Sequence, residues 1–416
     1  MNFKLLIGLL FCGIAFASAE SYEGYKVYDI NAKNVFEKEF LFQLSKDEKY
    51  DFFHLPKQIG TPSRVLVEPN DQYELENLLN KFGIQYIVID ENFGESVQAE
   101  RMQNALMRSL SSGQRISFNS FQRFDDINAY LDQLAKSYPS RVSVKTVGKS
   151  YEGRNMKTIT ITNGDGVQNK KVIFVDAGIH AREWIAPAGA LYIINQLVEN
   201  YAANANLLKT YDWVVLPVVN PDGYEYSHVA SRNWRKTRKP VTSSCAGTDG
   251  NRNFDFHWGE VGASTLSCAD TFRGQAAFSE PETQIVRDIM HSLTGRAKMY
   301  LTLHSYGNYL LYPWGYTSAL PATWRDMDEV AQAGANAIKA ATGTKYTVGS
   351  STNVLYAAAG GSDDYAHASA GIPISITMEL PAGGSGFNPS TSQITPFCSE
   401  TWIGIKAMAE KVIEKY

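Results

Sequence analysis

The sequence predicts an α/β protein: a large, mixed, mostly parallel sheet flanked by helices on both faces, preceded by a small α+β module. Two patterns carry this prediction. Helix-like and strand-like segments alternate for nearly 300 residues after Phe118, which is typical of a parallel sheet covered on both faces. In front of them, residues 25–90 follow the order strand, helix, strand, strand, helix, strand.

The composition is that of a globular protein with at least two domains. Of the 416 residues, 44% are hydrophobic and 20% are charged, which supplies a large core and excludes a mostly disordered chain. Asp and Glu outnumber Lys and Arg by 16 to 10 over residues 20–108, whereas the counts are 27 and 28 over residues 109–416. An acidic module thus precedes a nearly neutral one, and no block of Lys and Arg indicates a nucleic-acid partner.

Residues 1–19 have the pattern of a secretory signal peptide. Lys4 gives a short positive region, residues 5–16 are apolar, and Ala17-Ser18-Ala19 is a small-residue cleavage site. The alternative is a membrane anchor, but the apolar run is shorter than the roughly 20 residues that span a bilayer. We therefore expect a secreted, extracellular protein.

The first module is predicted from its hydrophobic periodicity. Val65 and Val67 alternate at period 2, while Leu75, Leu78 and Leu79 fall at helical spacing. The element order is that of a small open sandwich of ferredoxin type. The expected strands are 25–30, 50–55, 62–68 and 84–90, and the expected helices are 34–46 and 71–82.

A helical connector is expected over residues 93–111, ended by Ser111-Ser112-Gly113. It carries Arg101 and Arg108, and Arg115 follows soon after. One interpretation is an ordinary helical linker. The other is an exposed connector that a trypsin-like protease cuts at one of these three arginines, which releases the acidic module as a propeptide.

In the second module, helices are expected over 125–137 and 188–203, and strands over 172–177 and 213–219. In open α/β sheets, functional residues lie in loops beyond the carboxyl ends of the strands. We therefore expect the chemistry of this protein directly after its strands.

Three of the four cysteines remain once Cys12 leaves with the signal peptide. Cys245 and Cys268 flank a loop of 22 intervening residues, and a disulfide that closed it would contribute about 3 kcal/mol in the chain-entropy model. Cys398 is expected to be free and buried.

Candidate metal ligands follow two of the strands. His180 and Glu183 come after the strand at 172–177 and can converge on one ion if their turn winds helically, while His304 ends a strand-like run at 301–304. Two imidazoles and one carboxylate with an open fourth position make a catalytic zinc site. His-x-x-Glu alone is a weak signal. The other histidines are interpreted as surface or core residues: His54, His228, His257, His291 and His367.

Seven short motifs occur in order along the second module. They are Gly-Ile-His-Ala-Arg-Glu-Trp (178–184), Val-Asn-Pro-Asp-Gly-Tyr (219–224), Asn-Trp-Arg-Lys-Thr-Arg (233–238), Gly-Asn-Arg-Asn-Phe (250–254), Leu-His-Ser-Tyr-Gly (303–307), Tyr356 with Gly-Gly-Ser-Asp-Asp (360–364), and Thr-Met-Glu-Leu (377–380). In these motifs the chain resembles the pancreatic-type metallocarboxypeptidases, the A/B subfamily of secreted zymogens. The resemblance runs from about Phe118 to the C-terminus, and the acidic module fits the family's prodomain.

The resemblance implies one Zn²⁺ per chain, held by His180, Glu183 and His304. It implies that Glu379 is the general base that takes a proton from the attacking water at the zinc ion. Arg235 resembles the residue that stabilises the oxyanion as the scissile carbonyl becomes tetrahedral, because it places a fixed positive charge where negative charge develops.

The resemblance also implies a clamp for the substrate's terminal carboxylate. Arg252 offers a bidentate fork and Asn251 an amide donor. Tyr356 resembles the mobile tyrosine that closes over the substrate, on a loop with glycines that permit movement. Arg182 and Tyr306 fit secondary roles in positioning the substrate.

Asp363 suggests which residue is removed. By resemblance the side-chain pocket lies around Ser350, Ser351 and residues 360–364, and A-type enzymes carry an apolar residue where this chain has Asp363. A carboxylate buried in an otherwise uncharged pocket favours a substrate Lys or Arg, which is B-type specificity. The alternative is an Asp363 turned to solvent and A-type preference for aromatic or aliphatic residues. Ser351 stands where the B-type pocket often has Gly, so the pocket is expected to be slightly tighter.

The predicted organisation is a signal peptide at 1–19, an activation propeptide at 20–111 and a catalytic domain at 116–416. The expected enzyme is a monomer that hydrolyses the last peptide bond of peptides and proteins after a trypsin-like protease has removed the prodomain. Two other classes of protein are alternatives to this interpretation: a catalytically silent peptide-binding relative, and a deacylase of the wider zinc superfamily. The first should have lost a ligand or the base. The second generally lacks the prodomain and the complete clamp.

Overall fold

The computed structural model describes residues 20–111 and 116–416. The predicted signal peptide and the candidate cleavage residue Arg115 lie outside the described residues. No helix within the described ranges is long and apolar enough to cross a membrane.

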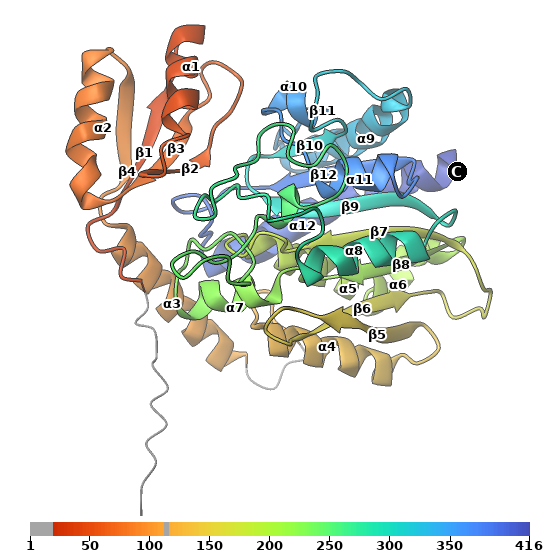
Figure 1. The fold of residues 1–416 in the computed structure, drawn as a ribbon. Helices are drawn as coiled ribbons and strands as arrows, with labels where there is room; N and C mark the ends of the chain where they lie inside the picture. The colour runs from red at the N-terminus through yellow and green to blue at the C-terminus, as the bar shows by residue number, and fades with distance from the viewer. Residues whose placement is uncertain (1–19, 112–115) are drawn as a thin grey trace, which may run out of the picture.

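The first module is a four-stranded antiparallel sheet with two helices on one face, in the strand order β2-β3-β1-β4 (Figure 1). This confirms the predicted ferredoxin-like order. The elements are β1 (Lys26–Asn31), α1 (Val35–Leu44), β2 (Tyr50–His54), β3 (Ser63–Val67), α2 (Pro69–Lys81) and β4 (Gln85–Asp90). Helix α2 begins two residues earlier than predicted because Pro69 occupies the first turn, where its missing N–H costs nothing.

Helix α3 (Phe93–Leu110) connects the modules and is not a free linker. Its buried positions include Phe93, Val97, Glu100 and Asn104, which lie at helical spacing on one face. Asn104 exchanges two hydrogen bonds with the backbone of Phe121. One side of the connector therefore packs on the second module, while the side chains of Met102, Leu106 and Leu110 are exposed.

The second module contains an eight-stranded mixed sheet in the order β11-β10-β12-β9-β7-β8-β6-β5 (Figure 1). Its centre, β12-β9-β7-β8, is parallel, and antiparallel pairs occur toward both edges. The strands are β5 (Val142–Lys149), β6 (Asn155–Ile161), β7 (Lys171–Ala177), β8 (Tyr211–Leu216), β9 (Ala297–Ser305), β10 (Tyr309–Tyr312), β11 (Thr347–Ser350) and β12 (Ile374–Leu380). Strand β8 ends before Pro217, earlier than predicted, because proline cannot donate to the ladder.

Helices cover both faces of this sheet, as predicted. One core cluster joins the sheet to α4 (Phe124–Ser137), α5 (Ile185–Val198), α9 (Trp324–Thr342) and α12 (Thr391–Lys415). A second cluster joins the opposite face to α8 (Pro281–Ser292) and α11 (Ser362–Ala368). The other α-helices of the described second module are α6 (Tyr201–Asn204), α7 (Pro221–Val229) and α10 (Ser351–Val354).

The single helix expected over 188–203 is two helices. Helix α5 ends at Val198, and α6 starts at Tyr201. The backbone N–H groups of Glu199 and Asn200 both donate to the carbonyl of Asn195, which closes the end of α5 and turns the chain.

The disulfide and the free cysteine are as predicted. Cys245 and Cys268 are bonded, with a Cα–Cα distance of 5.0 Å, and Cys398 is free and buried in α12. Lys236 donates to the carbonyl oxygens of Ser267 and Cys268. The bridged loop is thereby tied to the segment that carries Arg235.

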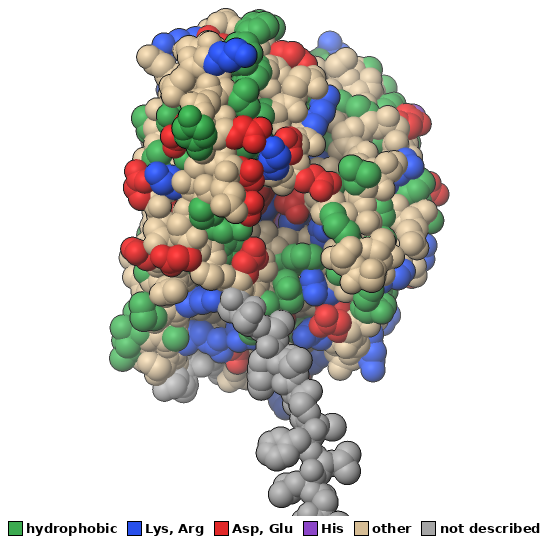
Figure 2. Space-filling view, turned by 60° about the vertical axis from the view of Figure 1, so that its left-hand side comes forward, with side chains coloured by type: hydrophobic (Ala, Val, Ile, Leu, Met, Phe, Trp, Pro, Cys, Tyr) green, Lys and Arg blue, Asp and Glu red, His purple; other side chains and the backbone are tan. Residues whose placement is uncertain are grey.

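Charged side chains of both signs are interspersed over the face seen in Figure 2, and acidic side chains gather beside a hollow in it. Hydrophobic side chains occur there in small separate groups. On this face, the described surface shows no continuous basic patch.

Glu282 is a buried carboxylate in the first turn of α8. Its Oε1 accepts a hydrogen bond from the backbone N–H of Tyr151 at 2.9 Å, and its Oε2 has no hydrogen-bond partner within residues 20–111 and 116–416. Burial raises the pKa of Glu282 to about 7, and the carboxylates of Asp222 and Glu280 contribute to the increase. The neutral form is therefore favoured in the folded protein.

We predict that Glu282→Gln stabilises the fold at pH 8 but not at pH 5. A carboxyl whose pKa is raised on folding contributes stability that is present at low pH and is lost as the pH rises from about 4.5 to about 7. The neutral amide should avoid that loss, with a gain of about 2 kcal/mol at pH 8. Chemical unfolding of both proteins at pH 5 and pH 8 measures the difference.

Asp288→Asn is the matched control, because Asp288 lies on the same helix with a side chain that is 67% exposed. It should respond little to pH. Equal responses from the two variants would contradict the assignment to Glu282.

Candidate metal centre and substrate cleft

Three predicted metal ligands meet at the carboxyl ends of β7 and β9. His180 and Glu183 lie in the turn between β7 and α5, and His304 is the second-last residue of β9. His180 Nδ1 is 2.8 Å from Glu183 Oε1, and His304 Nδ1 is 3.2 Å from both His180 Nδ1 and Glu183 Oε2. The turn is not helical, since α5 begins only at Ile185, but it still brings both side chains to one point.

This donor set fits a zinc ion. The three side chains are buried, and their ligand atoms all lie within 4.8 Å of one another. Although burial opposes it, the two imidazoles hold the pKa of Glu183 well below its ordinary value. Two imidazole nitrogens that face one another beside an ionised carboxylate suit a shared divalent cation, and this is the ligand set of catalytic zinc.

Asp249 links the metal ligands to Arg235, a role that the sequence did not reveal. Its Oδ1 lies 3.1 Å from His180 Nε2, and its Oδ2 accepts from Arg235 Nη2 at 2.9 Å. Burial would raise the pKa of Asp249, but Arg235 and Arg252 hold it well below its ordinary value. The sequence offered one indication of this role: Asp249 directly precedes the motif at 250–254, and it lies 69 residues after His180 in the sequence.

Glu379 lies beside the metal ligands on β12. In the parallel pairing of β12 with β9 it is the register partner of His304. Its Oε2 forms no hydrogen bond with any described residue. Glu379 is partly buried, and desolvation raises its pKa to about 8, with a further increase from Glu183 and a decrease from His304 and Arg235. A bound divalent cation would favour the ionised form.

The predicted carboxylate clamp sits on a short 3-10 turn at residues 250–252. Arg252 Nε donates to the carbonyl of Gly262 at 2.9 Å, and Nη1 donates to the carbonyl of Asn251. The backbone N–H of Ser362 donates to Asn251 Oδ1, which ties the clamp to α11. Tyr356 is 38% exposed, consistent with a loop residue that is not packed into the core.

Asp363 is buried and has no cation beside it. The side chain is 6% exposed, and its Oδ2 accepts weak hydrogen bonds from Ser351 Oγ at 3.2 Å and Thr377 Oγ1 at 3.3 Å. No ion pair to Asp363 exists among the described residues. The next residue, Asp364, accepts from the N–H groups of Gly315 and Tyr316, and burial together with the Asp363 charge raises its pKa.

Arg182 and Tyr306 face the first module. Arg182 Nη1 lies 3.2 Å from both carboxylate oxygens of Asp51 and 3.3 Å from Asp270, and its guanidinium stacks over Phe387. Tyr306 is in edge-to-face contact with Phe387, and the guanidinium of Arg64 lies over its ring. The sequence pattern did not single out Asp51, because only the packing of the two modules brings it to Arg182.

The first module lies over this end of the cleft. A hydrophobic cluster that includes Phe53 and Phe93 of the first module also contains Phe387 of the second. His54 Nε2 is 3.2 Å from the Tyr309 hydroxyl, and Lys57 donates to the carbonyl of Thr352 at 3.3 Å, next to Ser351. A cavity of about 220 Å³ remains between the modules, with Arg64 and Tyr306 in its wall.

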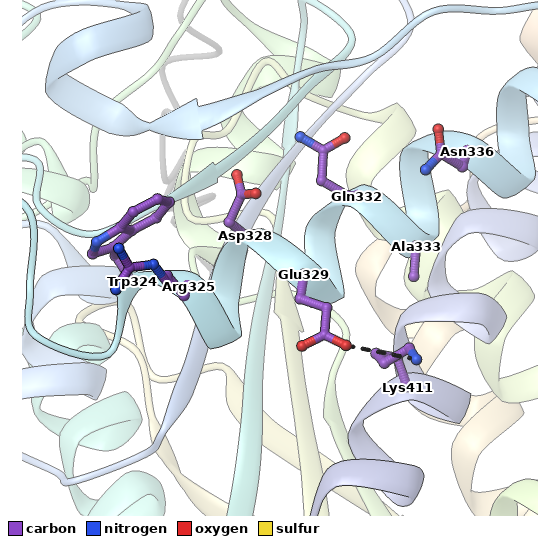
Figure 3. A pocket seen from close by; sticks show the side chains of 8 residues that line it. All are labelled: Trp324, Arg325, Asp328, Glu329, Gln332, Ala333, Asn336 and Lys411. Carbon is purple, nitrogen blue, oxygen red and sulfur yellow. Dashed lines mark ion pairs between the residues drawn. The ribbon is translucent and has the colours of Figure 1, made fainter.

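Another hollow, of about 590 Å³, lies on the surface between α9 and α12 (Figure 3). Most of its lining residues have polar side chains, and Glu329 pairs with Lys411 at its edge. None of the predicted functional residues lines it. The lining residues are Trp324, Arg325, Asp328, Glu329, Gln332, Ala333, Asn336 and Lys411.

A buried His-Glu-His cluster at the carboxyl edge of a mostly parallel sheet, with a second carboxylate beside it, defines a metal-dependent hydrolase. A family profile described as zinc carboxypeptidase matches residues 127–404, and one described as carboxypeptidase activation peptide matches residues 28–100. The chain belongs to the zinc carboxypeptidase family, whose members are exopeptidases, and it carries the family's activation peptide.

Similar proteins include both A- and B-type enzymes. Carboxypeptidase B of Helicoverpa zea is 38% identical over 427 aligned positions, which cover 98% of each chain. Carboxypeptidase B of Astacus astacus is 46% identical over 304 positions, covering 72% of this chain and all of that one. The crystal structure of carboxypeptidase A from Helicoverpa armigera superposes with a TM-score of 0.89 at 34% identity, covering 95% of this chain and 99% of that one.

We predict that Asp249→Asn weakens zinc binding by about 10- to 100-fold, the usual cost of losing a partner behind a metal-binding histidine. The amide keeps the shape of the carboxylate but removes the charge that orients His180. Competition with a chelating dye measures the zinc affinity, and circular dichroism reports whether the variant is folded.

Asp270→Asn is the control, because Asp270 contacts Arg182 but none of the metal ligands. Zinc affinity in this variant should stay at the wild-type value. A folded Asp249→Asn protein with wild-type zinc affinity would contradict the role of Asp249.

Proposed function

We propose that this chain is the precursor of a secreted, B-type zinc carboxypeptidase that removes C-terminal Lys or Arg from peptides and proteins. The single observation that carries the specificity is Asp363, a buried carboxylate without a cation among the described residues. An uncompensated buried charge is costly, and a substrate ammonium or guanidinium would neutralise it. Residues 1–19 support secretion by their sequence pattern alone.

In this proposal His180, Glu183 and His304 hold the zinc ion. The bound ion would polarise the scissile carbonyl and lower the pKa of the attacking water toward 7. Glu379 accepts the proton of that water on its unpartnered Oε2 and passes it to the leaving amine. Its register position beside His304 supports this role.

Arg235 and the clamp orient the substrate. Arg235 is held by Asp249, and its Nη1 lies 3.9 Å from Glu183 Oε1, so its charge sits beside the metal ligands. A guanidinium fixed there can stabilise the developing oxyanion. Asn251, Arg252 and Tyr356 would bind the terminal carboxylate, which restricts cleavage to the last peptide bond.

The activation peptide keeps the proform inactive by occupying residues that the substrate needs. Asp51 pairs with Arg182, and Phe53 packs on Phe387 beside Tyr306. Glu100 on α3 forms a buried ion pair with Arg232. Cleavage at Arg101, Arg108 or Arg115 by a trypsin-like protease would free all of these contacts, and the mature enzyme is proposed to be a monomer.

The test compares the purified proform before and after limited trypsin on matched peptides that end in Arg, Lys, Phe or Leu. We expect release of Lys and Arg only after trypsin, at a rate about 100-fold or more above Phe and Leu, because a charged pocket rejects apolar side chains. A chelator should abolish it. Asp363→Asn should remove the preference for basic residues and leave the slow release of Phe nearly unchanged.

Preferential release of Phe or Leu by the wild-type enzyme would instead establish A-type specificity. Failure to release any residue while zinc remains bound would favour a silent peptide-binding relative. Release of basic residues by Asp363→Asn at the wild-type rate would contradict the role of Asp363 in recognising a basic side chain.

We predict that Asp51→Asn raises the intrinsic activity of the uncleaved proform about 3- to 10-fold, since it removes the charge that occupies Arg182. The measurement is the rate of hydrolysis of a short substrate by intact proform, with electrophoresis to show that no cleavage has occurred.

Glu74→Gln provides a matched change in the same module, because Glu74 pairs with Lys49 on the surface. Its proform should remain at the wild-type rate. If the two variants behave alike, Asp51 does not hold the cleft closed.

A further inference from the structure

The two oxygens of the Asp363 carboxylate have different surroundings. Ser351 Oγ and Thr377 Oγ1 both donate to Oδ2, whereas Oδ1 accepts no hydrogen bond from any described residue. Oδ1 is reachable because Gly361 has no side chain, and a Cβ added there would lie 2.8 Å from it. The carboxylate thus presents one free oxygen.

Three separate elements fix this arrangement. Ser351 is the first residue of α10, Thr377 lies on β12, and Asp363 lies in the first turn of α11. Ser375 Oγ donates to the carbonyl of Asp363 at 2.8 Å, and Thr352 Oγ1 donates to the carbonyl of Gly315. These bonds fix the segments that carry Asp363 and Ser351. The hydroxyl groups of Ser351 and Thr377 are therefore held beside Asp363 by the fold and do not depend on a bound substrate.

The two basic side chains make different demands on a carboxylate. A guanidinium is a planar fork that binds both oxygens of a carboxylate at once. An ammonium is a compact charge with three donors that can rotate, and it needs only one carboxylate oxygen and nearby lone pairs. The hydroxyl oxygens of Ser351 and Thr377 supply such lone pairs around Asp363.

The depth of the pocket also favours lysine over arginine. Arginine is longer than lysine, and Ser351 adds a hydroxymethyl group to the pocket beside Oδ2. The Ser351 hydroxyl also lies 3.4 Å from the carbonyl of Tyr312. Its oxygen therefore lies between Asp363 and β10, where a longer guanidinium would have to displace it.

We infer that the pocket takes C-terminal lysine in preference to arginine, and that Ser351 and Thr377 set this preference by occupying one oxygen of Asp363. The inference rests on the proposed B-type function.

The experiment measures kcat/KM of the trypsin-activated enzyme on peptides that differ only in a last residue of Lys, Arg, Phe or Leu. The wild-type enzyme should favour Lys over Arg by about 5-fold or more, the order of discrimination that a small difference in pocket size gives. Ser351→Gly should lower the Lys-to-Arg ratio to near one, because it frees Oδ2 and deepens the pocket. Thr377→Val removes the second hydroxyl without changing the size of the side chain and should lower the ratio as well.

Ser369→Ala is the control, since Ser369 is exposed at the end of α11, and it should keep the wild-type ratio. Equal or faster release of Arg by the wild-type enzyme, with Phe and Leu slow, would overturn the inference and leave the B-type proposal standing. A ratio that neither variant changes would overturn the roles of the two hydroxyls. Faster release of Phe or Leu would overturn both the inference and the proposed function.

Discussion

The parallel pairing of β7, β9 and β12 is the constraint on which the site depends. Parallel strands end at the same edge, so residues far apart in the sequence meet there without any long-range contact of their own. The register of β12 on β9 sets Glu379 beside His304, and the pairing of β7 with β9 brings His180 and Glu183 to the same edge. Buried cores on both faces hold these strands rigidly, because most of their central positions are apolar. A shift of one residue in either pairing would turn a predicted ligand or the predicted general base to the opposite face of the sheet.

Oppositely charged side chains form buried pairs in the cleft at that edge of the sheet. Asp249 lies between His180 and Arg235, and Arg182 lies between Asp51 and Asp270, so both of these arginines have a carboxylate within hydrogen-bonding distance. Because they are paired, these charged side chains are held in fixed positions and orientations. Asp363 differs from these paired residues, because its carboxylate has only hydroxyl partners among the described residues. In the proposed function, a substrate Lys or Arg would supply the cation that Asp363 lacks.

Much of the fold and of the candidate site could be predicted from the sequence. The features that could not be predicted depend on tertiary packing. The element order of the first module, the candidate disulfide and the helices on both faces of the second module followed from local periodicity and spacing, and the grouping of His180, Glu183 and His304 followed from the family resemblance of short motifs placed at strand ends. Helix ends were shifted where Pro69 or the carbonyl of Asn195 decided them. Asp249, Asp51 and Thr377 could not be singled out, because each acquires its partner only through tertiary packing. The unequal use of the two Asp363 oxygens is likewise a property of three elements meeting in space.

The buried ion pair of Glu100 with Arg232 has an electrostatic consequence for the cleaved protein. In the proposed maturation, Glu100 would depart with the activation peptide whichever of Arg101, Arg108 and Arg115 is cut, because it precedes all three. Asp51 would depart as well, and cleavage after Arg108 would remove residues 20–108 with a net charge of −6, from 16 acidic and 10 basic residues. The remaining residues 109–416 have 27 acidic and 28 basic residues, a net charge of +1. The proposed maturation would therefore convert an anionic protein into a nearly neutral one, in which Arg232 has lost Glu100 and Arg182 has lost Asp51 but keeps Asp270. An anion-exchange column should then retain the precursor while the mature form passes through.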